Sequence, residues 1–220
     1  MASAKEIIAY RVAQDLKDGD VVNLGIGLPT QVANYVPEGI EIALQSENGI
    51  IGMAGVAAPE DVNPDITNAG GTNVTVNPGA AFFDSATSFG IIRGGHVDMT
   101  VLGALQVDQE GNLASHIIPG KMVPGMGGAM DLVVGAKKVV VAMQHTQKGA
   151  HKIFEKISLP ATALHCVDMI VTEMGVMEVT DKGLALRELA PGVTLEDIQA
   201  ATGCPLIVEG EIKEMAVPAE

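Results

Sequence analysis

The chain has 220 residues, 13 of them basic and 27 acidic, so its formal net charge at pH 7 is −14. Apolar residues make up 47% of the chain and the mean hydropathy is +0.30, which excludes wholesale disorder; the length suits one large or two small domains. The acidic balance argues against nucleic acid as a partner, because duplex-binding proteins use a basic stripe to displace counterions.

Neither a membrane span nor a secretory signal is predicted. The longest uncharged apolar-rich stretch, residues 49–59, falls well short of the ~18 residues that a membrane span needs. The first six residues show no basic head followed by an apolar block. We therefore expect no membrane association and a cytoplasmic location.

The first part of the chain alternates predicted helices and strands. Residues 3–17 form an amphipathic helix, because Ser3 and Glu6 have the spacing of a capping box and Gly19 can end it. The following elements are a strand over 20–24, a short helix over 30–36, and a strand over 42–45.

The second part continues this alternation. Asp84 can cap a helix that reaches Ile92, and Thr194 can cap a last helix ending at Gly203. Residues 99–105 and 139–143 are apolar without alternation, as strands buried on both faces of a parallel sheet are. Residues 176–180 and 184–188 flank Asp181-Lys182-Gly183, a hairpin signal. No linker divides the chain, so we predict a single α/β domain over residues 1–220, layered around a mostly parallel sheet.

Two glycine-rich segments could approach a ligand. In Gly25-Ile26-Gly27-Leu28-Pro29-Thr30, the first two glycines fit the dinucleotide fingerprint G-x-G-x-x-G, and Glu47 lies 22 positions after Gly25, near the place of an acidic ribose ligand. Thr30 replaces the third glycine, so a tight strand-to-helix turn competes with a nicotinamide site as the interpretation. Residues 124–131 hold three glycines within four positions, interleaved with methionine and alanine, which favours a functional loop over a solvated linker.

Several chemistries lack their usual sequence signals. The five histidines show neither H-x-x-x-H nor H-E-x-x-H spacing, and Cys166 and Cys204 form no C-x-x-C pair, so we expect no metal site and no disulfide framework. A phosphate-binding P-loop and the G-x-S-x-G turn of serine hydrolases are also absent from the sequence.

Glu47 is the strongest single candidate for chemistry. It follows an apolar strand and lies between Ser46 and Asn48, just before Gly49. A carboxylate at the carboxyl end of a parallel strand lies where open α/β sheets place their sites. Position alone favours a solvated glutamate at a strand end.

The segment Ser46-Glu47-Asn48-Gly49 resembles the S-E-N-G signature of the second, or B, subunit of class I CoA-transferases. Further segments resemble the same subunit, so the resemblance spans nearly the whole chain: residues 23–30, 68–71, 83–85, 92–98, 102–107, 119–122 and 126–133. It is nearest to the bacterial acetoacetate and butyrate–acetoacetate transferases, and it implies the sugar-phosphate-isomerase-like fold of that family.

The resemblance also implies a reaction. Glu47 attacks an acyl-CoA thioester, and a glutamyl-CoA thioester carries the CoA to an acceptor acid in a ping-pong sequence. Coenzyme A is then a substrate, and no cofactor is expected. The glycine-rich loop implies oxyanion donors at Gly128 first and at Gly127, and we expect Gly25, Gly27 and Asn48 to contribute to the substrate site.

The resemblance implies that class I CoA-transferases combine an A part with a B part, and this chain resembles only the B part. The expected partners are therefore a CoA-transferase A subunit, an acyl-CoA and small carboxylic acids. Three alternatives stay open at this point. They are transfer between another small acid pair, a nicotinamide-binding dehydrogenase domain built on Gly25 and Glu47, and a non-catalytic sensor domain of the related fold.

Overall fold

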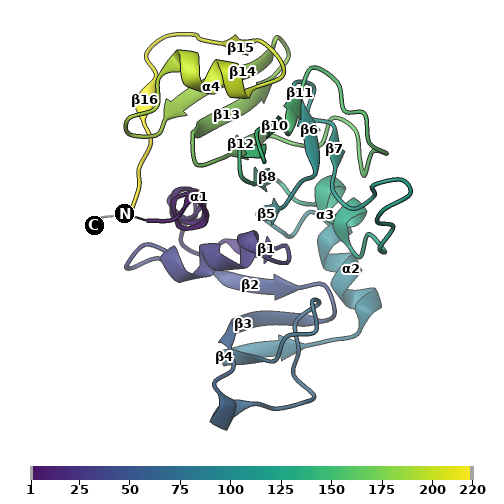
Figure 1. Ribbon diagram of the computed structural model, residues 1–220. Helices are drawn as coiled ribbons and strands as arrows, with labels where there is room; N and C mark the ends of the chain where they lie inside the picture. The colour runs from purple at the N-terminus through teal and green to yellow at the C-terminus, as the bar shows by residue number, and fades with distance from the viewer. Residues whose placement is uncertain (1, 219–220) are drawn as a thin grey trace.

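The computed structural model describes residues 2–218 and is built around one long mixed sheet (Figure 1). The helices are α1 (Ala4–Ala13), α2 (Ser85–Arg93), α3 (Ala129–Gly135) and α4 (Leu195–Ala201), with 3₁₀ helices η1 (Leu28–Tyr35) and η2 (Pro59–Asp61). The strands of the main sheet are β1 (Val21–Leu24), β2 (Ala43–Ser46), β3 (Ile50–Val56), β4 (Val74–Phe82), β5 (Met99–Leu102), β8 (Val139–Ala142), β12 (Met169–Val171), β13 (Gly175–Thr180), β14 (Gly183–Leu189), β15 (Leu206–Ile207) and β16 (Lys213–Glu214). Short strands β6 (Gln106–Asp108), β7 (Leu113–Ala114) and β11 (Ile153–Phe154) form a second sheet, and β9 (Thr146–Gln147) pairs with β10 (Ala150–His151).

The middle of the main sheet is parallel, and antiparallel strands follow it on both sides. The order is β15-β14-β13-β12-β8-β5-β1-β2-β3-β4, and the neighbours from β12 to β2 all pair in parallel. Strands β3 and β4 continue the sheet antiparallel on one side, and β13 and β14 do so on the other. The predicted α/β architecture with a mostly parallel centre is confirmed.

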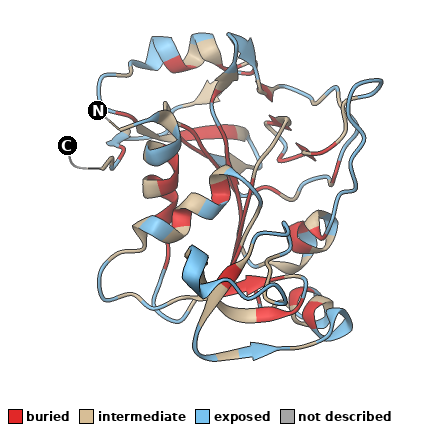
Figure 2. Cartoon of the chain, turned by 60° about the horizontal axis from the view of Figure 1, so that its bottom comes forward, coloured by how far each residue is buried: buried red, intermediate tan, exposed pale blue. Residues whose placement is uncertain are grey.

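The central strands are buried on both faces, which explains their unbroken apolar sequences. In β8, Val139 and Val141 pack into the core beside α2 and α3, whereas Val140 and Ala142 pack into the opposite core beneath α1. Figure 2 shows the buried residues concentrated on these strands and on the helix faces turned toward them. Each face of the sheet is therefore covered by helices of its own.

The predicted helix caps are confirmed, with differences in helix length and type. Ser3 and Glu6 form the capping box of α1, and Asp84 and Thr194 cap α2 and α4. Helix α1 ends at Ala13 because the next residues make tighter i→i−3 bonds, and the helix predicted over 30–36 is the 3₁₀ helix η1.

Strands β3 and β4 were not predicted. Their pairing is interrupted by register shifts, and glycine at position 52 adopts a φ of +85°, so the apolar pattern does not alternate regularly along them. The two strands form the lobe at the bottom of Figure 1, connected to β2 through the turn that carries Glu47. Among residues 2–218, no helix is both long and apolar enough to span a bilayer.

Candidate active site

A large cavity lies beyond the carboxyl ends of β1, β2 and β5. It encloses about 700 Å³ and is lined by residues that follow these three strands, including Gly25, Glu47 and Gly103, and by the loop before α3. The chain passes from β1 to β2 on one side and later returns to β5 on the other, so the cavity lies at a switch point of the sheet order. Open α/β sheets bind ligands at such points.

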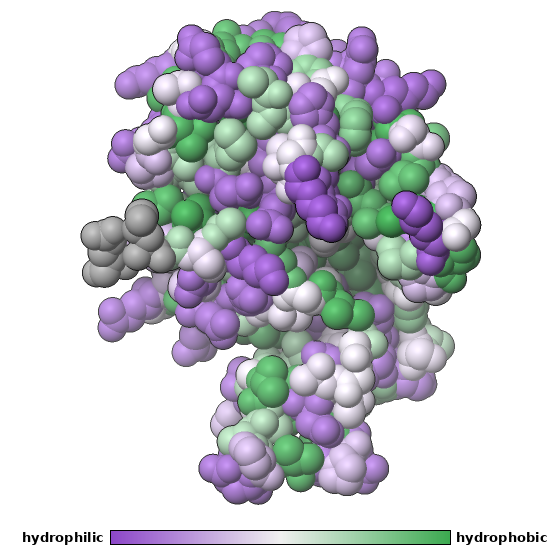
Figure 3. Space-filling model, in the orientation of Figure 1, coloured by the Kyte–Doolittle hydropathy of each residue, from purple (hydrophilic) through white to green (hydrophobic). Residues whose placement is uncertain are grey.

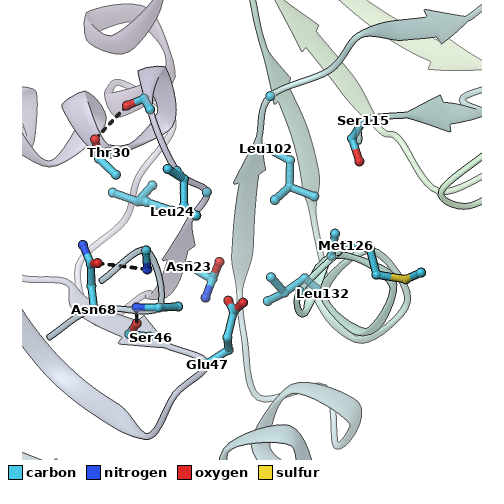
Figure 4. A pocket seen from close by; sticks show the side chains of 18 of the residues that line it. Asn23, Leu24, Thr30, Ser46, Glu47, Asn68, Leu102, Ser115, Met126 and Leu132 are labelled. Atoms are coloured by element: carbon cyan, nitrogen blue, oxygen red, sulfur yellow. Dashed lines mark hydrogen bonds between the residues drawn. The ribbon is translucent and has the colours of Figure 1, made fainter. Parts of the chain in front are cut away.

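The turn that carries Glu47 is tightly constrained. Ser46 closes it by accepting a hydrogen bond from the Gly49 N–H at 3.0 Å, and Gly49 adopts a φ of +118°. A Cβ atom at position 49 would overlap the carbonyl oxygen of Phe83, so this position requires glycine. The half-buried Glu47 side chain reaches into the cavity (Figure 4).

The glycine-rich loop meets the Glu47 carboxylate directly. The Gly128 N–H donates a hydrogen bond to Glu47 Oε1 at 3.1 Å. A Cβ atom on Gly128 would lie 3.0 Å from Glu47 Cδ, so a side chain there would crowd the carboxylate. Gly127 has a φ of +56°, and a Cβ on it would lie 3.4 Å from Oε1. The structure thus brings Glu47, Gly127 and Gly128 together across 80 residues of sequence.

Gly25 and Gly27 line the same cavity from the loop after β1. A Cβ on Gly25 would lie 3.1 Å from the Val101 carbonyl oxygen, so glycine lets this loop pack against β5. Gly27 has a φ of +90° and precedes η1, where its carbonyl oxygen accepts a hydrogen bond from Thr30 Oγ1 at 2.7 Å. Because η1 is a 3₁₀ helix, the loop does not open an α-helix as a dinucleotide fingerprint requires.

Asn48 is placed differently from the other predicted residues. Its side-chain amide donates to the Thr67 carbonyl oxygen at 2.7 Å, and it is not among the residues that line the cavity. This contact ties the Glu47 turn to the loop between β3 and β4. A role of Asn48 in substrate binding stays a prediction.

A buried amide network beneath Glu47 was missed by sequence reasoning. Asn23 Nδ2 donates to Gln45 Oε1 at 2.7 Å and to the Gln45 carbonyl oxygen at 3.2 Å, and Gln45 Nε2 donates to Ser88 Oγ at 3.0 Å. Asn23 and Gln45 line the cavity although each is almost fully buried. The available signal was an amide inside each of two apolar strands, since buried polar groups are retained only with partners.

The Asn23 amide has a fixed orientation in this network. The Gln45 carbonyl oxygen can only accept, so the nitrogen of Asn23 must face it and the amide oxygen takes the other side. Ser46 anchors the loop between β3 and β4, because its Oγ accepts a hydrogen bond from the Ala69 N–H at 3.0 Å. The floor under Glu47 is therefore held by hydrogen bonds between β1, β2 and α2.

The two cysteines lie outside this cavity and are poor nucleophiles. Cys166 is half-buried and Cys204 is buried. Burial raises the pKa of each thiol to about 11, so both are protonated at neutral pH. The Glu47 carboxyl group lines the cavity and accepts a backbone N–H, a placement that suits a nucleophile or a base.

The chain is similar to curated proteins over nearly its whole length. It is 55% identical over 216 residues to the acetate CoA-transferase subunit beta of Haemophilus influenzae, covering 98% of this chain and 96% of that protein. It is 58% identical over 200 residues to the subunit of the same name from Escherichia coli K12, covering 90% and 91%. It is also 49% identical to a mitochondrial succinyl-CoA:3-ketoacid coenzyme A transferase of Rattus norvegicus, covering 94% of this chain but 41% of that one.

Solved structures share the fold at low sequence identity. An acyl-CoA transferase of Escherichia coli O157:H7, solved as a thioester complex with CoA, matches with a TM-score of 0.78 and 23% identity over 98% of this chain and 44% of its own. The decarboxylase AibA/AibB matches with a TM-score of 0.76 and 20% identity over 99% of this chain and 90% of its own. The fold therefore serves more than one reaction, and the fold alone does not name the chemistry.

The sequence itself decides the family. The model of the coenzyme A transferase family matches residues 5–201, which include every element that lines the cavity. With that match and relatives above 50% identity, the chain belongs to the coenzyme A transferase family.

Proposed function

We propose that this chain is the catalytic B subunit of a short-chain acyl-CoA:carboxylate CoA-transferase of the 3-oxoacid and acetate type, with Glu47 as its nucleophile. The observation that carries the proposal is the Glu47 carboxylate, which reaches into a cavity of about 700 Å³ and meets the Gly128 N–H at 3.1 Å. Such a carboxylate can attack a thioester because the thiolate is a good leaving group.

The proposed reaction runs in balanced steps. A Glu47 carboxylate oxygen attacks the thioester carbonyl carbon, the C–S bond breaks, and CoA leaves as a thiolate, giving an acyl–glutamyl anhydride. The thiolate then attacks the glutamyl carbonyl carbon and expels the donor acid as its carboxylate, leaving a glutamyl-CoA thioester. An acceptor carboxylate reverses both steps. No electron or proton is consumed, so the proposed reaction needs no cofactor.

The Gly128 N–H is placed to stabilise the oxyanion that forms on Glu47 itself. It already contacts Oε1 of Glu47, which becomes the carbonyl oxygen of the anhydride and of the thioester. When the thiolate attacks the glutamyl carbon, negative charge develops on this oxygen. A preorganised N–H donor stabilises such a charge without rearrangement.

Two features favour an A subunit as the partner. The chain corresponds to about two fifths of the rat enzyme but to nearly all of the bacterial beta subunits. The anhydride must also be kept from water, but apolar side chains that line the cavity are exposed in this chain, among them Ile26, Val56 and Met126. A cytoplasmic location, where acyl-CoA is available, completes the proposal.

The structure bears differently on the three alternative functions. Transfer between other small acids remains open within the family. A nicotinamide site is disfavoured by the 3₁₀ helix after Gly27, and a non-catalytic sensor domain is disfavoured by the constrained nucleophile geometry around Glu47.

Trapping the covalent intermediate tests the proposal. The chain, co-expressed with its A subunit, is mixed with acyl-CoA in the absence of acceptor acid, treated with borohydride or hydroxylamine, and mapped by peptide mass spectrometry. We expect a CoA adduct in the intact mass before the treatment and modification at Glu47 after it, since these reagents attack thioesters and anhydrides, releasing CoA, but not a simple carboxylate. Modification at Cys166 instead, or no adduct in an active complex, contradicts the proposal.

A further inference from the structure

A polar cluster lies at a part of the cavity wall that the proposed mechanism does not use. Ser115 and His116 follow β7 and line the cavity, and behind them stands the buried Thr162. In Figure 4 the apolar side chains of Leu102 and Leu132 lie between Ser115 and Glu47, and Met126 lies to one side of them. An acyl chain that extends from Glu47 into this part of the cavity would meet both these apolar side chains and the polar cluster.

Thr162 Oγ1 is the centre of this cluster. It accepts the Ser115 backbone N–H at 3.0 Å, and it lies 2.8 Å from Ser115 Oγ and 3.1 Å from His116 Nδ1. Within residues 2–218, His116 Nε2 has no hydrogen-bond partner. It is not among the fully buried atoms that lack one, so it keeps some exposure. His116 is almost fully buried and lines the cavity, so we infer that this nitrogen is reached from the cavity.

Counting the hydrogens shows what the cluster offers to a ligand. Thr162 has one hydroxyl hydrogen, and its oxygen can accept one bond besides that from the Ser115 N–H. If the Thr162 hydroxyl donates to His116 Nδ1, Ser115 donates to Thr162, and the imidazole hydrogen lies on Nε2. If the Thr162 hydroxyl donates to Ser115, His116 Nδ1–H donates to Thr162, and the Ser115 hydroxyl hydrogen is left over. With a neutral imidazole, either arrangement leaves one donor for the cavity.

A donor of this kind selects among ligands. Water can accept its hydrogen bond while the cavity is open, but an acyl chain displaces that water. An all-carbon chain would then leave the donor unpaired, which costs binding energy, whereas a chain with a carbonyl oxygen at this point accepts the bond.

We propose that Ser115 and His116 are specificity-determining residues that hydrogen-bond an oxygen on the acyl chain, so that the site prefers 3-oxoacids to unsubstituted acids of the same length. This inference rests on the proposed function and names the substrate class of that same cavity. Thr162 is a positioning residue, since it contacts Ser115 and His116 and is not among the residues lining the cavity.

Acetoacetate and butyrate are the matched probes, because they differ only by the oxygen on the third carbon. For each acid, kcat/KM as CoA acceptor is measured in the complex with the A subunit. The ratio of the two values, acetoacetate over butyrate, is the readout. Butyrate serves as an internal control for folding, because loss of folded enzyme lowers both values together.

The hydrogen count predicts a non-additive pattern of variants. In Ser115→Ala, the Thr162 hydroxyl donates to His116 Nδ1 and Nε2–H remains; in His116→Phe, the Ser115 hydroxyl is released. Each single variant should therefore change the ratio less than about threefold, and the double variant, which removes both donors, should lower it about tenfold. The matched control Ser115→Ala/His116→Gln keeps an amide that reaches the Nε2 position and should retain most of the ratio.

Three outcomes overturn the inference. The first is an unchanged ratio in the double variant. The second is an equal fall for both acids with a raised KM for the CoA ester, which would mean that the cluster binds the pantetheine amide carbonyl of CoA. The third is a wild-type ratio at or below one. If the wild-type complex transfers CoA to neither of these acids nor to acetate, the proposed function fails instead.

Discussion

The nucleophile of the proposed reaction is held on two sides by glycine. Gly49 allows the turn that presents Glu47 from β2, and Gly128 allows a backbone N–H to approach Oε1 to 3.1 Å. Neither position tolerates a Cβ atom without movement of a neighbouring group. The geometry of one carboxylate therefore depends on two positions that carry no side chain.

Removing or shortening the Glu47 side chain tests the nucleophile. Glu47→Ala should abolish CoA transfer, and Glu47→Asp should retain about 1% of it, because misplacement on the ~1 Å scale can cost about a hundredfold. Steady-state kinetics of the complex with the A subunit measures both. Near-normal turnover in a purified Glu47→Ala complex would show that another group is the nucleophile.

A side chain at position 128 tests the oxyanion donor. In Gly128→Ala the new Cβ would lie 3.0 Å from Glu47 Cδ and displace the carboxylate from the N–H, so kcat should fall about tenfold or more. Gly90→Ala in α2 is the matched control, because a Cβ there meets nothing within 4 Å and alanine suits a helix. Equal kcat values in these two variants would remove Gly128 from the proposed mechanism.

At the scale of elements, a buried histidine joins the carboxyl-terminal part to the central sheet. His145 is fully buried, with Nδ1 2.9 Å from Thr172 Oγ1 after β12 and Nε2 2.9 Å from Thr202 Oγ1 after α4. Thr202 donates its own hydrogen to the Ile198 carbonyl oxygen, so it accepts from His145 Nε2–H. Burial first, and then the charges of His151 and Lys152, lower the pKa of His145 to about 4.

This histidine predicts a pH dependence of stability. The unfolded chain takes up a proton near pH 6.5, whereas folded His145 does so near pH 4, so the free energy of unfolding should fall as pH drops through this window. The loss attributable to His145 amounts to about 3 kcal/mol, reached near pH 4. Urea titrations at several pH values measure it, with His145→Gln as comparison. If the two stability curves run parallel between pH 4 and 6.5, His145 is not the cause.

At the scale of the whole molecule, the surface beside the cavity has the exposed apolar side chains of an interface that lacks its partner. The recess in the face shown in Figure 3 is lined largely by apolar side chains. Ile26 and Val56, which both line the cavity, are 76% and 74% exposed. Exposed apolar groups gathered near a site usually mark an interface. The net charge of −14 also makes a second chain useful for holding the CoA phosphates.

We therefore predict that the chain alone is nearly inactive. Expressed by itself it should transfer CoA at less than about 1% of the rate of the complex with an A subunit, because water then reaches the anhydride. Light scattering for the mass in solution, together with CoA exchange, checks this. Full activity from a homogeneous sample of this chain as a homodimer, the alternative assembly, is the result that would refute it.

The sequence by itself determined the class of fold and the family, and it singled out Glu47 as the candidate nucleophile. Apolar runs such as Val139–Met143, helix caps such as Asp84 and the S-E-N-G segment are local signals, and they identify a buried parallel strand, a helix start and a family signature without knowledge of the fold. The caps were confirmed because an N-cap needs only residues three positions apart. Strands β3 and β4 were not predicted from the sequence, because bulges at glycine break the alternation on which strand prediction depends.

The tertiary structure alone decided which residues meet. Gly128 was expected near Glu47 through a resemblance, but the 3.1 Å contact exists because the loop before α3 folds over the end of β2. Asn48 stands beside Glu47 in sequence and yet bonds to Thr67, since successive residues in a turn point in different directions. The Asn23–Gln45–Ser88 network and the Ser115–His116–Thr162 cluster join residues 22 to 47 positions apart, so no local pattern announces them. Hydrogen bonding between side chains depends on position in space, and only the packing of the sheet and its loops determines that.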